Sequence, residues 1–341
     1  MENVARKAAD GLSPASAAID PADAAKLVRR STLIGLFAPV CWGMSVGLVR
    51  GIAEGFGLAQ GQCMLYCVAA AFLFFLVGLP DFRRMDKRYL FIGLPTANLS
   101  SLCFCLAIFF SEGGAQTVEV GMVNYLWPSL TILFAVLFNG VRTRWWLFPG
   151  LLIAFAGIVV ILSGDDGFSP SAFAARVAAH PVSYILALGA ALTWAAFSSM
   201  TRAWSKGINP STVVFIADAL IFSMLWAAGV GSGPAEASMR GILSVIFGGL
   251  AMGCAYAAWT LGMSKGNITI LALASYFTPV LSCLFAVFWI NASLGGTFWL
   301  GVAIVVAGSL ICWDATDRGM KAKLAREGTL KAKSAAEHAS A

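Results

Sequence analysis

The residues of this chain that could bind a small molecule are polar and aromatic groups in the middle of long apolar stretches. They are Trp42, Ser45, Asn98, Asn124, Tyr125, Trp127, Trp194, Ser198, Ser275, Tyr276 and Thr278. Hydroxyl and amide groups at that depth can hydrogen-bond the polar end of a ligand, and rings can stack on its apolar part or attract a cation. Interhelical hydrogen bonding is the alternative role for each Asn or Ser. We expect these residues to line a substrate site.

Asp218 is an acidic residue that lies deep inside an apolar stretch. Asn209 and Pro210 are typical of a helix start, which places Asp218 about two turns into its helix. If that stretch spans a membrane, the carboxylate is a functional-site hypothesis by default, here a proton or cation site. A structural ion pair with Arg202 or Lys206 is the alternative.

The motifs of a catalytic centre are missing from the sequence. There is no P-loop and no HExxH motif, and the eight cysteines form no CxxC pair or Cys/His spacing. No Lys or Arg lies at mid-membrane depth, which disfavours phosphorylated substrates. We therefore expect no enzyme activity, no metal, no cofactor and no nucleic-acid partner. The expected partners are the lipid bilayer and a neutral or zwitterionic small molecule.

The elements that must position these residues are ten apolar stretches. The chain is 59% hydrophobic and 12% charged, about half the charged fraction of a soluble domain. The stretches are 31–50, 61–80, 89–110, 117–138, 145–163, 181–203, 210–232, 240–262, 268–290 and 295–313. Each is long enough to cross about 30 Å of hydrocarbon as a helix. The small-residue series Gly43/Gly47/Gly51 and Gly249/Gly253 predict close helix approaches.

Lys and Arg residues gather in alternate connections between these stretches. With ten crossings and a cytoplasmic N-terminus, 20 of the 23 Lys and Arg residues fall on the cytoplasmic side. Arg50, Arg176 and Arg240 fall on the opposite side. This bias is the positive-inside pattern of membrane proteins. The basic pI of about 9.0 therefore indicates orientation, and we expect both termini in the cytoplasm.

The two halves of the chain repeat one another. Residues 124–136 return as 275–287 with seven of thirteen positions identical. Trp42 matches Trp194, and the pair Ala156-Gly157 matches Ala307-Gly308. Each half holds five stretches, so the second half must cross the membrane in the opposite sense, as in transporters built from inverted repeats.

The repeated phrase places a proline near the middle of the fourth and ninth stretches. A proline inside a helix lacks an N–H and frees the carbonyl four residues earlier. At Pro128 and Pro279 those carbonyls belong to Asn124 and Ser275. We expect helix breaks at both prolines, with the freed carbonyls facing a central site. A kink that serves packing alone is the alternative.

These features resemble the drug/metabolite transporter superfamily. Within it, the run Gly-Met-Val-Asn-Tyr-Leu-Trp-Pro at 121–128 and the Glu-Gly-Gly-Ala stretch from Glu112 are similar to the YddG-type aromatic amino acid exporters. The resemblance covers about residues 31–315. It implies export of aromatic amino acids, and of other amino acids or cationic aromatic compounds, across a bacterial inner membrane.

The predicted fold class is therefore an all-α polytopic membrane protein with ten transmembrane helices. They form two inverted five-helix repeats around a central cavity. The parts are a cytoplasmic N-terminal tail (1–30), the first repeat (31–163), an outer linker (164–180), the second repeat (181–315) and a cytoplasmic C-terminal tail (316–341).

The function predicted from these features is export of amino acids, above all aromatic ones, by alternating access. Three alternatives stay open. One is a multidrug or nucleoside exporter on the same scaffold. Another is a channel-like facilitator without a coupling ion, and the last is a membrane scaffold that transports nothing.

Overall fold

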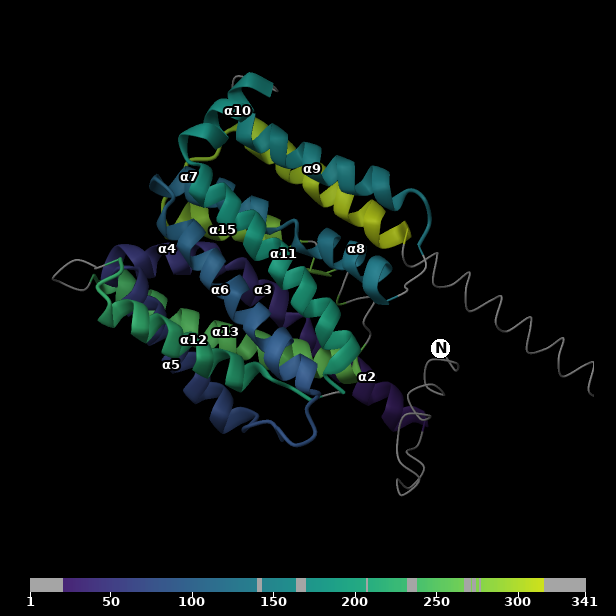
Figure 1. Ribbon diagram of the computed structural model, residues 1–341. Coiled ribbons are helices and arrows are strands. Elements are labelled where there is room, and N and C mark those ends of the chain that lie inside the picture. Colours follow the sequence, from purple (N-terminus) through teal and green to yellow (C-terminus); the bar gives the residue numbers. More distant parts are fainter. Residues whose placement is uncertain are drawn as a thin grey trace, which may run out of the picture.

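The computed structural model describes residues 21–139, 143–163, 170–206, 208–231, 238–266, 271, 274–275 and 277–315. This part of the chain is helical and contains no strands (Figure 1). Its elements are α2 (Pro21–Gly35), α3 (Phe37–Gly43), α4 (Ser45–Phe56), α5 (Leu58–Leu76), η1 (Tyr89–Gly93), α6 (Leu94–Phe109), α7 (Gly113–Asn124), α8 (Trp127–Asn139), α9 (Leu147–Ser163), α10 (Pro170–Ala179), α11 (Pro181–Trp204), α12 (Ser211–Ala227), α13 (Met239–Lys265) and α15 (Thr278–Trp289). A last helix runs from Gly296 to Ala315.

Helices lie in each of the ten predicted stretches where the structure describes them, but fewer are long enough to cross a membrane by themselves. In the described part of the chain six helices pass a test of length and hydropathy, and a bent pair raises the number to seven. Three shorter apolar helices, Leu147–Ile161, Ser211–Ala227 and Thr278–Trp289, fall below the length required. The all-helical membrane architecture is thus present, with six to seven candidate crossings.

The first predicted stretch is interrupted in two places. The chain leaves α2 at Leu36 and leaves α3 at Met44, and the segments on either side of Met44 are bent by 43°. Pro39 lies in the short α3 between these interruptions, and a proline cannot donate the backbone hydrogen bond that would continue α2. The sequence prediction of one continuous helix over 31–50 was wrong here.

Glycines bring helices into contact where the sequence predicted close approaches. A Cβ added to Gly43 would lie 2.8 Å from Leu281 Cβ on α15, and one added to Gly249 would lie 2.6 Å from Val68 on α5. Such distances leave no room for a side chain. The prediction that these glycines allow close packing is confirmed.

The repeated Ala-Gly pairs lie on two helices that pack against each other. A Cβ on Gly157 of α9 would lie 2.6 Å from the backbone of Val305, and one on Gly308 would meet the backbone of Ala154. Figure 1 shows α9 beside the last helix of the chain. Segments that correspond in the two sequence halves therefore meet in space.

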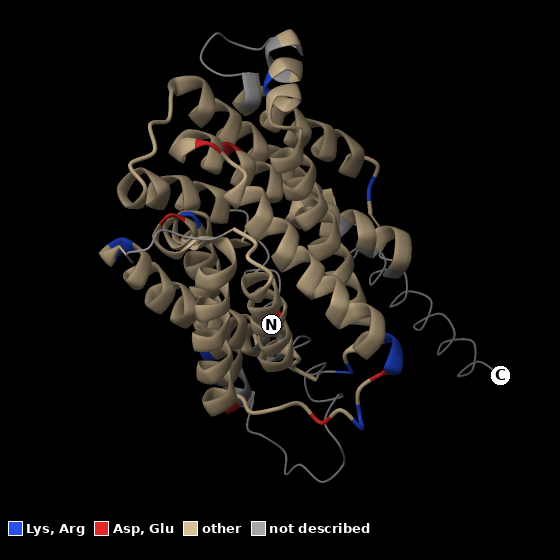
Figure 2. Cartoon of the chain, turned by 60° about the vertical axis from the view of Figure 1, so that its left-hand side comes forward, with Lys and Arg blue, Asp and Glu red and all other residues tan. Residues whose placement is uncertain are grey.

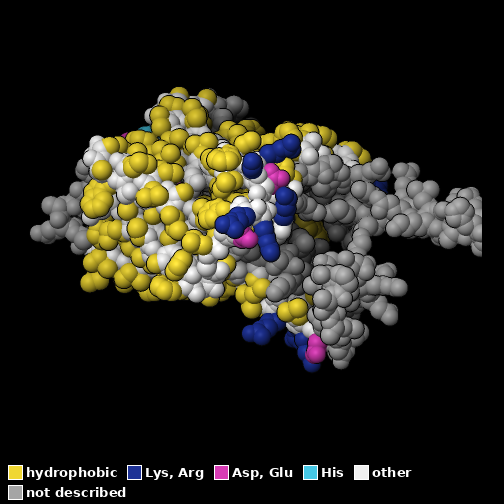
Figure 3. All heavy atoms as spheres, turned by 60° about the horizontal axis from the view of Figure 1, so that its bottom comes forward, with side chains coloured by type: hydrophobic (Ala, Val, Ile, Leu, Met, Phe, Trp, Pro, Cys, Tyr) yellow, Lys and Arg dark blue, Asp and Glu magenta, His cyan; other side chains and the backbone are white. Residues whose placement is uncertain are grey.

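The surface is strongly apolar between two charged ends. Large side chains such as Phe75, Phe288 and Phe91 are 87%, 82% and 72% exposed. In Figure 2 almost all Lys, Arg, Asp and Glu residues lie at helix ends or in connections. Figure 3 shows Lys and Arg side chains gathered at one end beside a broad hydrophobic face. An apolar surface of this extent fits a lipid environment.

Candidate functional site

Three tryptophans from three helices meet near the centre of the bundle. Trp42 comes from α3, Trp127 from the start of α8 and Trp194 from α11. Their ring centroids are 6.2 Å apart for Trp42 and Trp127, 6.4 Å for Trp42 and Trp194, and 6.3 Å for Trp127 and Trp194. All three pairs meet edge to face, the arrangement that the ring quadrupole favours. The matched pair Trp42 and Trp194 thus lies at the junction of the two sequence halves.

Helix α13 adds aromatic groups that the sequence analysis missed. Tyr256 packs against Trp42 at 5.9 Å and against Trp194 at 5.7 Å. On its other side it contacts Phe215 of α12 at 4.7 Å. Tyr256 lies mid-span like Trp42, so depth alone could have identified it.

The bend between α3 and α4 presents a carbonyl to this cluster. The carbonyl oxygen of Trp42 accepts hydrogen bonds from Ser45 Oγ at 2.7 Å and from the Tyr125 hydroxyl at 3.2 Å. Tyr125 belongs to the two-residue break between α7 and α8. The same carbonyl also accepts from a backbone N–H at the end of α3, and the two hydroxyl groups add side-chain donors that join two interrupted helices through one backbone oxygen.

A cavity opens beside these rings and has a volume of about 110 Å³. We call it the aromatic cavity. Its wall consists of Trp42, Ser45, Tyr66, Ser100, Ser101, Phe104, Asn124, Tyr125, Trp127, Trp194, Phe215, Met252 and Tyr256. Hydroxyl and amide groups alternate with rings, and no wall residue is charged. The mixture matches the general pattern of small-molecule sites, which combine an apolar lining with a few polar groups.

Six of the predicted site residues line this cavity: Trp42, Ser45, Asn124, Tyr125, Trp127 and Trp194. The others that the structure describes lie off its wall. Ser198 is half-buried on α11, while Ser275 and Thr278 are buried beside the start of α15. Tyr276 lies outside the described residues. Tyr66, Ser100, Ser101 and Phe104 are wall residues that no sequence pattern had indicated, because nothing in the sequence shows which face of α5 or α6 turns inward.

The predicted residues Asn98 and Asp218 bind each other. Asn98 Nδ2 donates to Asp218 Oδ1 at 2.8 Å and to the Val214 carbonyl at 2.9 Å. Both side chains are buried, and neither lines the cavity. The alternative was an ion pair with Arg202 or Lys206. Lys206 Nζ lies 3.8 Å from Asp86 Oδ2 instead, and the side chain of Arg202 lies outside the described part of the chain.

Pro128 and Pro279 lie in the first turn of a helix. Helix α8 begins at Trp127 and α15 begins at Thr278, so each proline is the second helical residue. The missing N–H has no helical acceptor at that position, and proline is well suited to it. Breaks occur at the predicted places, but the prolines start helices there rather than interrupt their middles.

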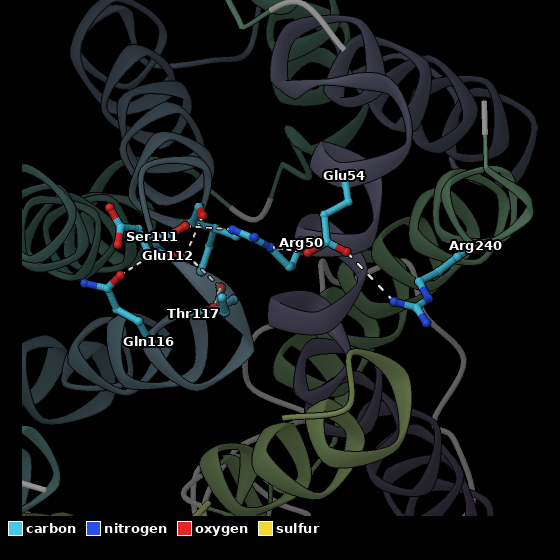
Figure 4. Close-up of polar contacts among 9 residues, drawn as sticks. Arg50, Glu54, Ser111, Glu112, Gln116, Thr117 and Arg240 are labelled. Carbon is cyan, nitrogen blue, oxygen red and sulfur yellow. Dashed lines mark hydrogen bonds and ion pairs between the residues drawn. The ribbon is translucent and has the colours of Figure 1, made fainter. Parts of the chain in front are cut away.

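A group of ion pairs lies farther along α4, here called the Arg50 cluster: Arg50, Glu54, Ser111 and Arg240 (Figure 4). Arg50 Nε lies 2.6 Å from Glu54 Oε1, and its Nη1 donates to the Ser111 carbonyl at 2.7 Å. Arg240 Nη1 approaches Glu54 Oε2 at 3.9 Å. The cluster joins α4 to the turn before α7 and to the start of α13.

Comparisons with known proteins place the chain among transporters. Residues 181–313 match the model of the EamA-like transporter family. The aromatic amino acid exporter YddG of Salmonella typhimurium (strain 14028s / SGSC 2262) is 42% identical over 291 residues, covering 85% of this chain and 99% of that protein. The chain belongs to the YddG family of EamA-like transporters. It is therefore a multi-pass membrane transporter.

Other family members support the assignment. The aromatic amino acid exporter YddG of Escherichia coli (strain K12) is 41% identical over 293 residues, covering 85% of this chain and 99% of that protein. The YddG of Ancylobacter novellus is 28% identical over 200 residues, covering 58% of this chain and 67% of that protein. A crystal structure with 21% identity matches with a TM-score of 0.60 over 85% of this chain and 98% of that chain, which supports the fold of the YddG-family chain.

Proposed function

We propose that the chain exports aromatic amino acids by alternating access through the aromatic cavity. The observation that carries this proposal is a box of four rings, those of Trp42, Trp127, Trp194 and Tyr256. The centroids of its contacting rings lie 5.7–6.4 Å apart. Aromatic walls recognise aromatic ligands by offset and edge-on ring contacts. The family relatives that carry the name of aromatic amino acid exporters support the same substrate class.

Polar groups of the wall suit the other end of such a substrate. Asn124, Ser45, Ser100 and Ser101 present amide and hydroxyl groups to the cavity. They can donate to a carboxylate and accept from an ammonium group, so a zwitterion is bound without a fixed charge in the wall. We keep Ser198, Ser275 and Thr278 outside the proposed site, and Tyr276 stays a predicted member of it.

The cavity must enlarge to admit this substrate. Its volume of about 110 Å³ is below the roughly 150 Å³ of an engineered cavity that binds benzene. An aromatic amino acid is larger than benzene, so rings of the box must separate when it binds. The breaks at Met44 and at Tyr125–Leu126 are the places where short helical segments that carry Trp42 and Trp127 can turn.

The proposed architecture is ten crossings in two inverted repeats, 31–163 and 181–315, joined by a linker at 164–180. The family match over 181–313 supports a unit with the bounds of the second repeat. The contact of α9 with the last helix and of Trp42 with Trp194 supports the pseudo-two-fold relation. In this arrangement α9, α12 and α15 are short crossings.

The proposed location is a bacterial inner membrane, with tails 1–30 and 316–341 in the cytoplasm. The charged end that carries Arg83, Arg84, Lys87 and Arg88 faces the cytoplasm, and the Arg50 cluster faces the opposite side. Positive-inside orientation supports this assignment.

The test is uptake into proteoliposomes that contain the purified protein. Radiolabelled Phe, Trp and Tyr are compared with aliphatic amino acids, nucleosides and cationic drugs, with protein-free vesicles as the control. We expect saturable flux of the three aromatic amino acids. Flux of nucleosides or drugs without amino acids would assign the cavity to another exporter class, and absence of any saturable flux would contradict transport.

A further inference from the structure

The Asp218–Asn98 pair lies directly behind the wall of the aromatic cavity. Asp218 is 1% exposed, and Asn98 is 7% exposed. Both N–H groups of the Asn98 amide are used, one for Asp218 Oδ1 and one for the Val214 carbonyl. The amide is therefore held between α6 and α12, and it fixes the orientation of the carboxyl group.

The second carboxyl oxygen, Asp218 Oδ2, is buried and has no hydrogen-bond partner of normal geometry among the described residues. No ion pair of the described residues includes Asp218. Glu119 differs, since it pairs with Arg176 at 2.9 Å and accepts from the Tyr184 hydroxyl at 3.1 Å. Asp218 is thus a buried acid without a cation.

Within the part of the chain that the structure describes, the groups that face Asp218 from neighbouring helices are uncharged. They are Tyr66 of α5, Ser101 and Cys105 of α6, and Tyr256 of α13. Tyr66 is fixed in turn by contacts with Cys105 Sγ at 3.7 Å and with the ring of Phe222. An ionised carboxylate in such surroundings costs much free energy unless water or a cation reaches it.

The cavity is one layer of side chains away from the pair. Phe215, three residues before Asp218 on α12, lines the cavity, and so does Ser101, three residues after Asn98 on α6. Residues three apart share a helix face. Ser101 is therefore both a residue of the cavity wall and a near neighbour of the Asp218 carboxyl. A bulky ligand cannot touch Asp218 past Phe215, but a proton can pass through a hydroxyl group.

We propose that Asp218, oriented by Asn98, is a proton-binding site that couples proton entry to substrate export. The proposal rests on the function proposed above. When the cavity faces outward and contains water, the carboxylate takes a proton from that water and becomes a neutral acid. When the cavity faces inward, the acid returns the proton to cytoplasmic water. A zwitterionic substrate has no net charge, so each exchange moves one positive charge inward per amino acid exported.

The first experiment measures accumulation of labelled Phe in proteoliposomes with an acidic interior. Proton efflux should then drive Phe inward, so we expect accumulation several-fold above that without a pH gradient, abolished by a protonophore. Asp218→Asn should lose this gradient-driven accumulation and keep saturable tracer exchange. Asp86→Asn is the matched control, because it removes a partly exposed acid that pairs with Lys206, and it should keep the gradient effect.

The outcomes separate the two proposals. Absence of any saturable flux in wild-type protein overturns the proposed function, and the coupling proposal falls with it. Saturable flux that ignores the pH gradient overturns coupling alone. Gradient-driven accumulation that persists in Asp218→Asn overturns the assignment to Asp218.

An infrared measurement on wild-type protein covers the case in which Asp218→Asn does not fold. Phe binding should change the C=O stretching band of a buried protonated carboxyl, and Asn98→Ala should shift that band because it removes the hydrogen bond to Oδ1. A protein whose protonated carboxyl bands do not respond to Phe at any pH would contradict the proposal.

Discussion

The aromatic cavity and the Arg50 cluster both include residues of α4, but their side chains differ in kind. Arg50 follows Ser45 by five residues on α4, about 7.5 Å farther along the axis. The cavity wall is uncharged, whereas the cluster contains two arginines and a carboxylate. Ring contacts can be exchanged for contacts with a ligand, but ion pairs and charged hydrogen bonds fix the helices that carry them. The difference assigns substrate recognition to the cavity and helix anchoring to the cluster.

The largest effect is expected on the recognition of Phe, from Trp194→Ala. This change removes three edge-to-face contacts of the box and one ring from the wall. Ring contacts contribute about 1 kcal/mol each, so we expect the KM for Phe to rise about tenfold or more. The measurement is a saturation curve for Phe uptake into proteoliposomes.

Trp259→Ala is the matched control for that prediction. Trp259 packs on Trp42 at 5.1 Å but does not line the cavity. It should lower stability with a much smaller change in KM. Equal KM values for Trp194→Ala and wild type would show that the box does not contact the substrate.

The second-largest effect is expected on stability, from Arg50→Met, because Arg50 anchors α4. The side chain of Arg50 is 16% exposed, and its loss leaves the Ser111 carbonyl without this donor. Hydrogen bonds to charged groups contribute about 2 kcal/mol. We expect a lower Tm in detergent with an unchanged KM for Phe. A raised KM at unchanged Tm would show that the cluster takes part in substrate recognition, which would contradict the difference drawn between it and the cavity.

A smaller effect on stability is expected within the cavity wall, at the Trp42 carbonyl. Tyr125→Phe removes one of its two side-chain donors and should cost about 1 kcal/mol. Ser45→Ala removes the other. Because both donate to one oxygen, the double variant should lower the Tm by more than the sum of the single changes. Additive changes would show that the carbonyl does not join the two helix breaks.

The smallest effect is expected from Arg240→Gln. Its contact with Glu54 is long, at 3.9 Å, and both side chains are more than two-fifths exposed. Exposed pairs contribute about 0–1 kcal/mol and weaken in salt. We expect a Tm within about a degree of wild type, with any difference lost at high salt. A fall as large as that of Arg50→Met would mean that Arg240 anchors the cluster.

Much of the helix pattern could be predicted from the sequence, because apolar stretches of membrane length are a local property. The contact between Trp42 and Trp194 could also be predicted from the sequence, since equivalent residues in inverted repeats can approach a shared axis. Pro39 was overlooked as the cause of the break in the first stretch. The prolines of the repeated phrase did mark breaks, but their position as second helical residues depends on how Tyr125 and Leu126 leave the preceding helix.

The rest of the site depends on contacts between distant segments. Asn98 and Asp218 were both selected for their depth, yet their mutual hydrogen bond spans 120 residues and no local pattern encodes it. Tyr66 and Tyr256 reach the cavity or its boundary because of helix rotation. Rotation is set by packing of the whole bundle, including the glycine contacts of α13 with α5.

The central claim is that an aromatic amino acid occupies the aromatic cavity. The most direct measurement is photolabelling of the purified protein with an azido derivative of phenylalanine, followed by mass spectrometry of the labelled peptides. We predict label on peptides that carry Trp127, Trp194 or Tyr256, and its loss when excess Phe competes. Label confined to the lipid-facing surface, or label on the cavity that Phe does not displace, would contradict the claim.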